Sequence, residues 1–210
     1  MDTKAMGCCI VLEGADNSGK TTLSLAIADR VMQEGGDFMY LHGRPWVGTV
    51  LREHTRMAGH AAIAGRDTVV VMDHFWIAEY LYGFEYRGKP AYDVKPMDAT
   101  MQQLRALIVL CVPTNLVAQT ERHLERRAKG KEEFAQASGI IRRYADLWHG
   151  NRSHKGDGYL DAAIRGETFC QRNDVVRYDM DLTEDVNQRA TKLLTKARQR
   201  RWVSNMELPH

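Results

Sequence analysis

The sequence lacks the features that would place it in a membrane or in a disulfide scaffold. No apolar run approaches the roughly 20 residues that a membrane-spanning helix needs. The four cysteines form no CxxC pair, and three of them (Cys8, Cys9 and Cys111, but not Cys170) lie in apolar runs, so we expect reduced thiols, most of them in the core. The N-terminal residues include an acid and lead into only a short apolar stretch, so we expect no signal peptide and a cytoplasmic location.

The chain also lacks a large excess of charge of either sign. The formal net charge is +2 at pH 7, which is too small to indicate nucleic-acid binding over the whole surface. The hydrophobic content of 44% and the charged content of 27% are those of an ordinary globular protein. A length of 210 residues predicts one domain spanning residues 1–210.

Short β-rich runs alternate with longer amphipathic stretches. We expect strands at 8–12, 38–41, 68–72, 107–112 and 175–178. Helical spacing predicts helices between the first two strands, over 134–148 and over 184–199, and a short one over 159–169 after the loop at 149–158. The alternation indicates an α/β fold with a five-stranded parallel sheet flanked by helices.

The strongest motif is the phosphate loop that follows the first strand. Gly14, Gly19, Lys20 and Thr21 satisfy GxxxxGK[ST] between an apolar strand and an amphipathic helix. Backbone N–H groups of such a loop surround phosphate oxygens, the lysine lies at the β- and γ-phosphates, and the threonine hydroxyl can ligate Mg²⁺. The motif therefore predicts ATP and Mg²⁺ as cofactors.

Two further residues are expected at the same edge of the sheet. Asp73 ends the third strand, where it could organise Mg²⁺, hold a substrate hydroxyl or merely cap the strand end. Arg44 follows the second strand, and a guanidinium suits bidentate phosphate binding.

The segment 120–131, TERHLERRAKGK, is rich in basic residues. It could be an ordinary solvated helix face, but the glycine at position 130 and the place after the fourth strand favour an arginine-bearing lid over the phosphates, at about 121–133. The segment 84–93, FEYRGKPAYD, interleaves aromatic and basic residues and could either stack against a nucleotide or form an exposed connection.

Taken together, four motifs resemble the thymidylate kinase family of P-loop nucleoside monophosphate kinases. They are IVLEGADNSGKTTL (10–23), MDHFWIAEYLYG (72–83), LIVLCVPTNLVAQTERHLERR (107–127) and VVRYDMDLTEDV (175–186). The resemblance covers most of the chain in order. It implies the P-loop NTPase fold with a short lid, and here an extra loop-helix segment at about 149–170.

The resemblance also implies roles for individual residues. The ATP-binding set would be Gly14, Asn17, Ser18, Gly19, Lys20, Thr21 and Thr22, and Thr21 and Asp73 would hold Mg²⁺. The catalytic set would be Lys20, Asp73, Arg122, Arg126 and Arg127. Some members carry a catalytic arginine in the phosphate loop, but Asn17 occupies that position here, so the three lid arginines would take over its role.

On the acceptor side, Asp16 would contact the sugar 3'-hydroxyl, Tyr82 would crowd the 2' position, and Arg44 would bind the acceptor phosphate. His74 stands where the family has an arginine, and Glu79 stands at a base-contact position.

The sequence therefore predicts a deoxynucleoside monophosphate kinase that transfers the ATP γ-phosphoryl group to a thymidylate-like or modified pyrimidine nucleotide. Two alternatives stay open: a kinase acting on a hydroxymethylated base in a nucleotide or in DNA, and a non-catalytic nucleotide-dependent binding module. The resemblance implies a possible homodimer, and the scattering of basic residues into short clusters does not favour DNA as a partner.

Overall fold

A parallel five-stranded sheet forms the centre of the computed structural model, which describes residues 7–43, 48–63, 67–127, 131–149, 174–182 and 184–200. The strand order is β2-β3-β1-β4-β5. The strands are β1 (Cys8–Glu13), β2 (Asp37–His42), β3 (Thr68–Asp73), β4 (Leu107–Cys111) and β5 (Val175–Tyr178). All four strand pairs are parallel, so the carboxyl ends of the strands meet at one edge.

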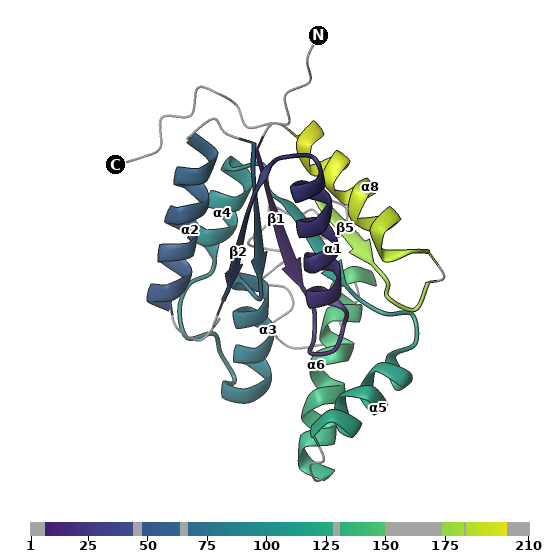
Figure 1. Ribbon diagram of the computed structural model, residues 1–210. Helices are drawn as coiled ribbons and strands as arrows, with labels where there is room; N and C mark the ends of the chain where they lie inside the picture. The colour runs from purple at the N-terminus through teal and green to yellow at the C-terminus, as the bar shows by residue number, and fades with distance from the viewer. Residues whose placement is uncertain are drawn as a thin grey trace.

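Helices cover both faces of the sheet, as Figure 1 shows. They are α1 (Lys20–Gln33), α2 (Gly48–Ile63), α3 (Trp76–Arg87), α4 (Lys95–Gln103), α5 (Leu116–Arg127), α6 (Lys131–His149) and α8 (Val186–Gln199). One apolar cluster joins the sheet to α1 and α8, and the other joins it to α2, α3, α4 and α6. In Figure 1, α5 and the lower half of α6 extend beyond the carboxyl edge of the sheet.

The alternation of side chains along β1 explains the two layers. Cys9 and Val11 belong to the cluster under α3 and α6, whereas Ile10 and Leu12 belong to the cluster under α1 and α8. Every residue of β1 is buried, as expected of a central parallel strand covered on both faces. Truncating such a side chain to alanine costs about 2–5 kcal/mol.

The fold predicted from the sequence is confirmed, and the strand boundaries agree to within a residue or so. The stripe over 134–148 is α6, and the closing helix is α8. The helices α2 and α4 were not predicted, because α2 contains two glycines and α4 is short with a proline in its first turn. The expected helix over 159–169 and nearly all of the extra segment at 149–170 lie outside the described residues.

The cysteines Cys8, Cys9 and Cys111 are free and buried, as expected, and Cys170 lies outside the described residues. Burial raises the pKa of Cys8 and Cys111 to about 12. In the part of the chain that the structure describes, none of the helices combines the length and the apolar character needed to span a membrane.

Candidate nucleotide-binding site

The phosphate loop lies at the carboxyl end of β1, next to the end of β3. Leu12 pairs with Asp73, and Glu13 pairs with Leu110 of β4, so the loop leaves the sheet between these two neighbours. The loop turns sharply because Asn17 and Gly19 both have positive φ angles, 61° and 83°. A non-glycine residue in this region is uncommon and costs of order 1 kcal/mol or more, so the surrounding contacts must hold Asn17 there.

Lys20 reaches back over the loop that precedes it. Its Nζ donates hydrogen bonds to the carbonyl oxygens of Gly14 at 2.7 Å and Ala15 at 2.8 Å, and the side chain is buried. Thr21 and Thr22 follow in the first turn of α1 and are exposed, and Gly19 precedes the helix. The structure thus brings the predicted ATP-binding residues together around one turn and one helix N-terminus, where an anion is favoured.

Two small residues form the floor of the loop. A Cβ atom at Gly14 would lie 2.6 Å from the carbonyl oxygen of Cys111 and 2.6 Å from Oγ of Ser18. The Ser18 hydroxyl is buried and has no hydrogen-bond partner among the described residues. The loop therefore packs against the end of β4 with no room for a side chain at position 14.

Asp73 lies beside the loop and is almost completely buried. Its Oδ2 accepts a hydrogen bond from the hydroxyl of Tyr40 at 2.7 Å, and Nδ1 of His42 lies 3.6 Å from the same oxygen. Its Oδ1 is buried and has no hydrogen-bond partner among the described residues. One oxygen is thus oriented by β2, and the other is buried without a partner among the described residues.

His74 follows Asp73 with a positive φ of 56°. Its Nε2 lies 3.7 Å from Oδ1 of Asp16, and its ring meets His42 and Tyr82 edge-on, at centroid distances of 6.0 and 6.1 Å. Burial, together with the charges of Lys20 and His42, lowers the pKa of His74 from 6.5 to about 2. The imidazole is therefore neutral at any physiological pH.

Aromatic rings continue from His74 in both directions. Tyr40 stacks on His42 at 6.3 Å, and Tyr82 stacks on Tyr86 at 5.9 Å. The backbone N–H of Asp16 also donates a hydrogen bond to the hydroxyl oxygen of Tyr82. The predicted acceptor residues Asp16, His74 and Tyr82 thus lie in contact with one another.

Glu79, the predicted base-contact residue, forms its contacts with the end of α3 and the segment that follows it, and not with Asp16, His74 or Tyr82. It is buried in α3, and its Oε1 accepts hydrogen bonds from the Arg87 guanidinium and from the backbone N–H of Ala91. This carboxylate joins α3 to the segment that follows it. The Arg87 side chain of the 84–93 segment is accordingly committed to an internal ion pair.

Glu13 is a residue that our sequence analysis did not place in the site. It is fully buried, and its Oε1 accepts hydrogen bonds from the backbone N–H groups of Phe75 at 3.0 Å and Ile77 at 3.1 Å. Burial raises its pKa to about 8, despite these hydrogen bonds and the nearby charge of Lys20. An acidic residue ending a continuous apolar strand was the available signal, because such a residue must have buried partners.

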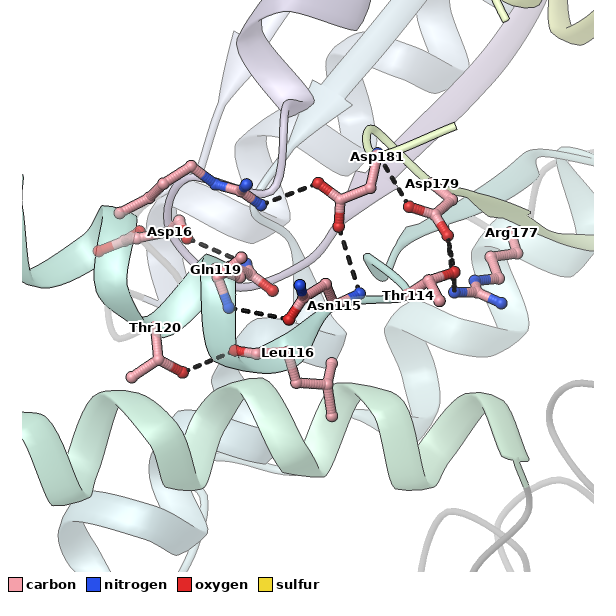
Figure 2. Close-up of polar contacts among 11 residues, drawn as sticks. Asp16, Thr114, Asn115, Leu116, Gln119, Thr120, Arg177, Asp179 and Asp181 are labelled. Carbon is pink, nitrogen blue, oxygen red and sulfur yellow. Dashed lines mark hydrogen bonds and ion pairs between the residues drawn. The ribbon is translucent and has the colours of Figure 1, made fainter. Parts of the chain in front are cut away.

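The helix α5 carries the first of the predicted lid arginines. Arg122 donates from Nη2 to Oδ1 of Asp181 at 3.1 Å, and Asn115 donates its backbone N–H to Oδ2 of the same residue at 3.3 Å. Gln119 donates from Nε2 to the carbonyl oxygen of Asp16 at 3.2 Å. Figure 2 shows this network between α5, the phosphate loop and the loop after β5.

Asp179 fastens the loop after β5 to the loop after β4. It accepts hydrogen bonds from the Thr114 hydroxyl, from Arg177 Nη2 at 2.9 Å and from the backbone N–H of Asp181 at 3.0 Å (Figure 2). Burial alone would raise its pKa, but the hydrogen bonds and the Arg177 charge outweigh burial and lower it. This carboxylate is therefore charged at neutral pH.

Three predicted site residues have no described side chain. Arg44 lies outside the described residues, and Arg126 and Arg127 lie in the last turn of α5, where only the backbone is described. The described residues contain no group of three or more His, Cys, Asp or Glu side chains that could hold a metal ion. That is compatible with Mg²⁺, which commonly uses one or two protein oxygens together with substrate phosphates and water.

No protein-family model and no curated protein matches this chain. Among solved structures, the chain is similar to the YorR protein of Bacillus subtilis, solved in complex with phosphorylated GDP. The identity is 12%, the match covers 89% of this chain and 94% of that chain, and the TM-score is 0.58.

Two further solved structures match with lower TM-scores. The first is APE1195, with 17% identity, 93% and 97% coverage of this chain and that chain, and a TM-score of 0.46. The second is the thymidylate kinase from Ehrlichia chaffeensis, with 14% identity, 90% and 96% coverage, and a TM-score of 0.38.

The sheet order, the phosphate loop and the match to the YorR structure define an α/β fold of the P-loop kind, as the sequence predicted.

Proposed function

We propose that this protein is an ATP-dependent kinase that transfers the γ-phosphoryl group to the 5'-phosphate of a deoxynucleoside monophosphate. The observation that carries the proposal is the juxtaposition of the Lys20 loop at the end of β1 with the buried carboxylate of Asp73 at the end of β3. Phosphoryl transfer needs positioning and charge neutralisation rather than a covalent intermediate. The described residues supply groups for both.

On the donor side, the loop N–H groups and the α1 N-terminus would hold the phosphates, and Lys20 would exchange its two carbonyl partners for phosphate oxygens. Arg122 retains a buried Nε with no hydrogen-bond partner among the described residues, so it has a donor to offer a phosphate. Arg126 lies four residues further along α5, on the same helix face. The proposal assigns the transferred charge to Lys20 and to the lid arginines.

Mg²⁺ would neutralise phosphate charge, and the residues present fit this ion. The free Oδ1 of Asp73 is a hard oxygen ligand in a buried position, and Thr21 stands in the first turn of α1 with its side chain exposed. Tyr40 leaves that oxygen unengaged because it binds Oδ2.

On the acceptor side, the carboxylate of Asp16 and the ring of Tyr82 would hold the sugar, and Arg44 would bind its phosphate. The contacts among Asp16, His74 and Tyr82 support a common pocket for these roles. The bound nucleotide of YorR supports a nucleotide ligand in this fold.

One observation favours a second candidate, a kinase whose acceptor is a hydroxyl group, such as that of a hydroxymethylated base. His74 is neutral and stands where the resembling family has an arginine, so this position offers less attraction to an acceptor phosphate. A hydroxyl acceptor needs a proton acceptor instead, and Asp73 has an unengaged carboxylate oxygen.

The test is release of ADP from Mg-ATP in the presence of a panel of acceptors. The panel contains deoxy- and ribonucleoside monophosphates, free deoxynucleosides, and duplex DNA with and without hydroxymethylated pyrimidines, with GTP as a second donor. Turnover with a deoxynucleoside monophosphate, lost in Lys20→Ala but kept in the surface variant Lys196→Ala, would support the proposal. Turnover only with hydroxyl acceptors would favour the second candidate, and ATP binding without any turnover would favour a binding module.

A further inference from the structure

Asp16 is held by groups from two separate parts of the fold. On the acceptor side, its backbone N–H donates a hydrogen bond to the hydroxyl of Tyr82 in α3, and Nε2 of His74 lies 3.7 Å from its carboxylate. On the opposite side, Gln119 of α5 donates a hydrogen bond to its carbonyl oxygen. The residue that follows, Asn17, has the positive φ of 61°. These contacts hold a strained part of the phosphate loop in place.

The contact from Gln119 comes from the same helix face as two other anchored residues. Asn115 immediately precedes α5, and Gln119 and Arg122 follow it within the helix at steps of four and three residues, so the three lie on one side of this segment. Asn115 and Arg122 both bind Asp181, and Gln119 binds the phosphate loop between them (Figure 2). The start of the lid helix is thus attached to the loop after β5 at two points and to the phosphate loop at one.

Burial of the Gln119 amide lowers the stability of the folded protein unless the amide has hydrogen-bond partners. The residue is 1% exposed, and its Oε1 is buried with no hydrogen-bond partner among the described residues. A buried, unsatisfied amide oxygen costs about 1–3 kcal/mol, which an apolar side chain of similar size would avoid. Packing alone therefore does not explain a glutamine here, whereas its hydrogen bond to Asp16 does.

We propose that Gln119 is a positioning residue that ties the lid helix α5 to the phosphate loop, so that binding of the donor phosphates repositions Arg122. When the loop rearranges around a triphosphate, the Asp16 carbonyl moves with it, and the amide transmits that movement to the helix. Arg122, on the same helix face, then meets the phosphates around which the loop has rearranged. This inference rests on the proposed function, because it requires a nucleoside triphosphate in the loop.

The first experiment measures hydrogen exchange in peptides covering residues 116–127, with and without the non-hydrolysable ATP analogue AMP-PNP and Mg²⁺. In the wild-type protein we expect the analogue to slow exchange by about 5-fold or more, the factor that one net hydrogen bond provides. The affinity of Gln119→Leu for the analogue should be within about 3-fold of that of the wild-type protein, but the analogue should not slow hydrogen exchange in these peptides. Equal slowing in both proteins would overturn the inference.

Gln119→Met is the second variant, since it keeps the length and volume of the side chain and removes the amide without placing a charge in a buried position. It should fold even if the leucine variant does not, and it should likewise lose the slowing. Gln102→Leu is the matched control. It makes the same change on an exposed residue of α4, which leads into the amino end of β4, and it should behave as wild type.

The second experiment is kinetic. Gln119→Leu should lower kcat by about 10-fold or more with little change in KM for ATP, and Gln119→Leu combined with Arg122→Ala should be scarcely slower than Arg122→Ala alone. Additive effects of the two changes would show that Gln119 does not act through Arg122. If the wild-type protein does not bind AMP-PNP at all, the proposed function fails first, and that result is distinct from a lost coupling in a protein that binds it.

Discussion

The carboxylate of Glu13, at the end of the central strand, accepts a hydrogen bond from the hydroxyl of Tyr144 at 3.2 Å, although 131 residues separate them in the chain. The same carboxylate accepts the N–H groups of Phe75 and Ile77 at the start of α3. One buried acid therefore fastens β1, α3 and α6 together directly beneath the phosphate loop. Burial raises its pKa to about 8, so this junction carries a proton at neutral pH.

The first prediction concerns the pH dependence of stability. The pKa of Glu13 is about 8 in the folded protein against 4.5 unfolded, so the folded state binds the extra proton between these values. Stability should therefore fall as pH rises from about 4.5 to 8, by up to about 1.4 kcal/mol per pH unit, and level off above 8. Glu13→Gln should remove this contribution. Thermal unfolding of both proteins at pH 5, 6, 7 and 8 checks it, and parallel curves would contradict it.

The second prediction concerns His74. Its pKa of about 2 keeps the imidazole neutral in the folded protein, whereas the unfolded chain binds a proton below pH 6.5. The carbon-bound ring proton of His74 should thus keep a constant NMR chemical shift between pH 5 and 8, and this residue should contribute a loss of stability as pH falls below 6.5. His74→Gln assigns the signal by its disappearance. A titration midpoint near 6.5 would show that the ring is solvated.

The third prediction tests the orientation of Asp73. Tyr40→Phe removes the hydroxyl that binds Oδ2 but keeps the ring that stacks on His42. Because a carboxylate without its partner can rotate, we expect kcat to fall by about 10-fold and the Mg²⁺ concentration for half-maximal activity to rise, with ATP affinity little changed. Steady-state kinetics over a Mg²⁺ titration measures both. Wild-type behaviour in this variant would mean that Tyr40 plays no part in positioning Asp73.

The fourth prediction uses two glycines. Gly14→Ala would place a Cβ atom 2.6 Å from the backbone oxygen of Cys111, which cannot move without disturbing β4, so we expect loss of nucleotide binding and about 2 kcal/mol or more of stability. Gly35→Ala is the control: its φ of 73° strains an alanine, but no atom lies within 4 Å of the new Cβ. It should cost about 1–2 kcal/mol and leave nucleotide binding intact, as measured by denaturant unfolding and by nucleotide titration.

Much of the fold could be predicted from the sequence because the signals were local. The buried strands read as continuous apolar runs, and the GK[ST] motif set the start of α1. Asp73 was expected at the edge of the sheet because the carboxyl ends of parallel strands converge there. That expectation needed the chain order and the strand pattern alone.

The rest depends on contacts between residues far apart in the chain. No local pattern indicates that the hydroxyl of Tyr144 reaches Glu13, or that Arg87 forms an ion pair with Glu79. The resemblance placed Glu79 at a base contact by its spacing alone, which does not reveal the partner of a side chain. Gln119 was also missed, because an isolated glutamine in a charged helix gives no sign that it is buried.

Under the proposed function, the two hydrogen bonds from Lys20 to the carbonyl oxygens of its own loop bear on how a nucleotide leaves the site. When a nucleotide leaves, the ammonium group can return to partners that the chain itself provides, so departure of the product does not strand a buried charge. The loop is then held in shape for the next substrate by its own backbone. We therefore expect release of the product of the proposed reaction to be easier than it would be from a lysine that had no other acceptor.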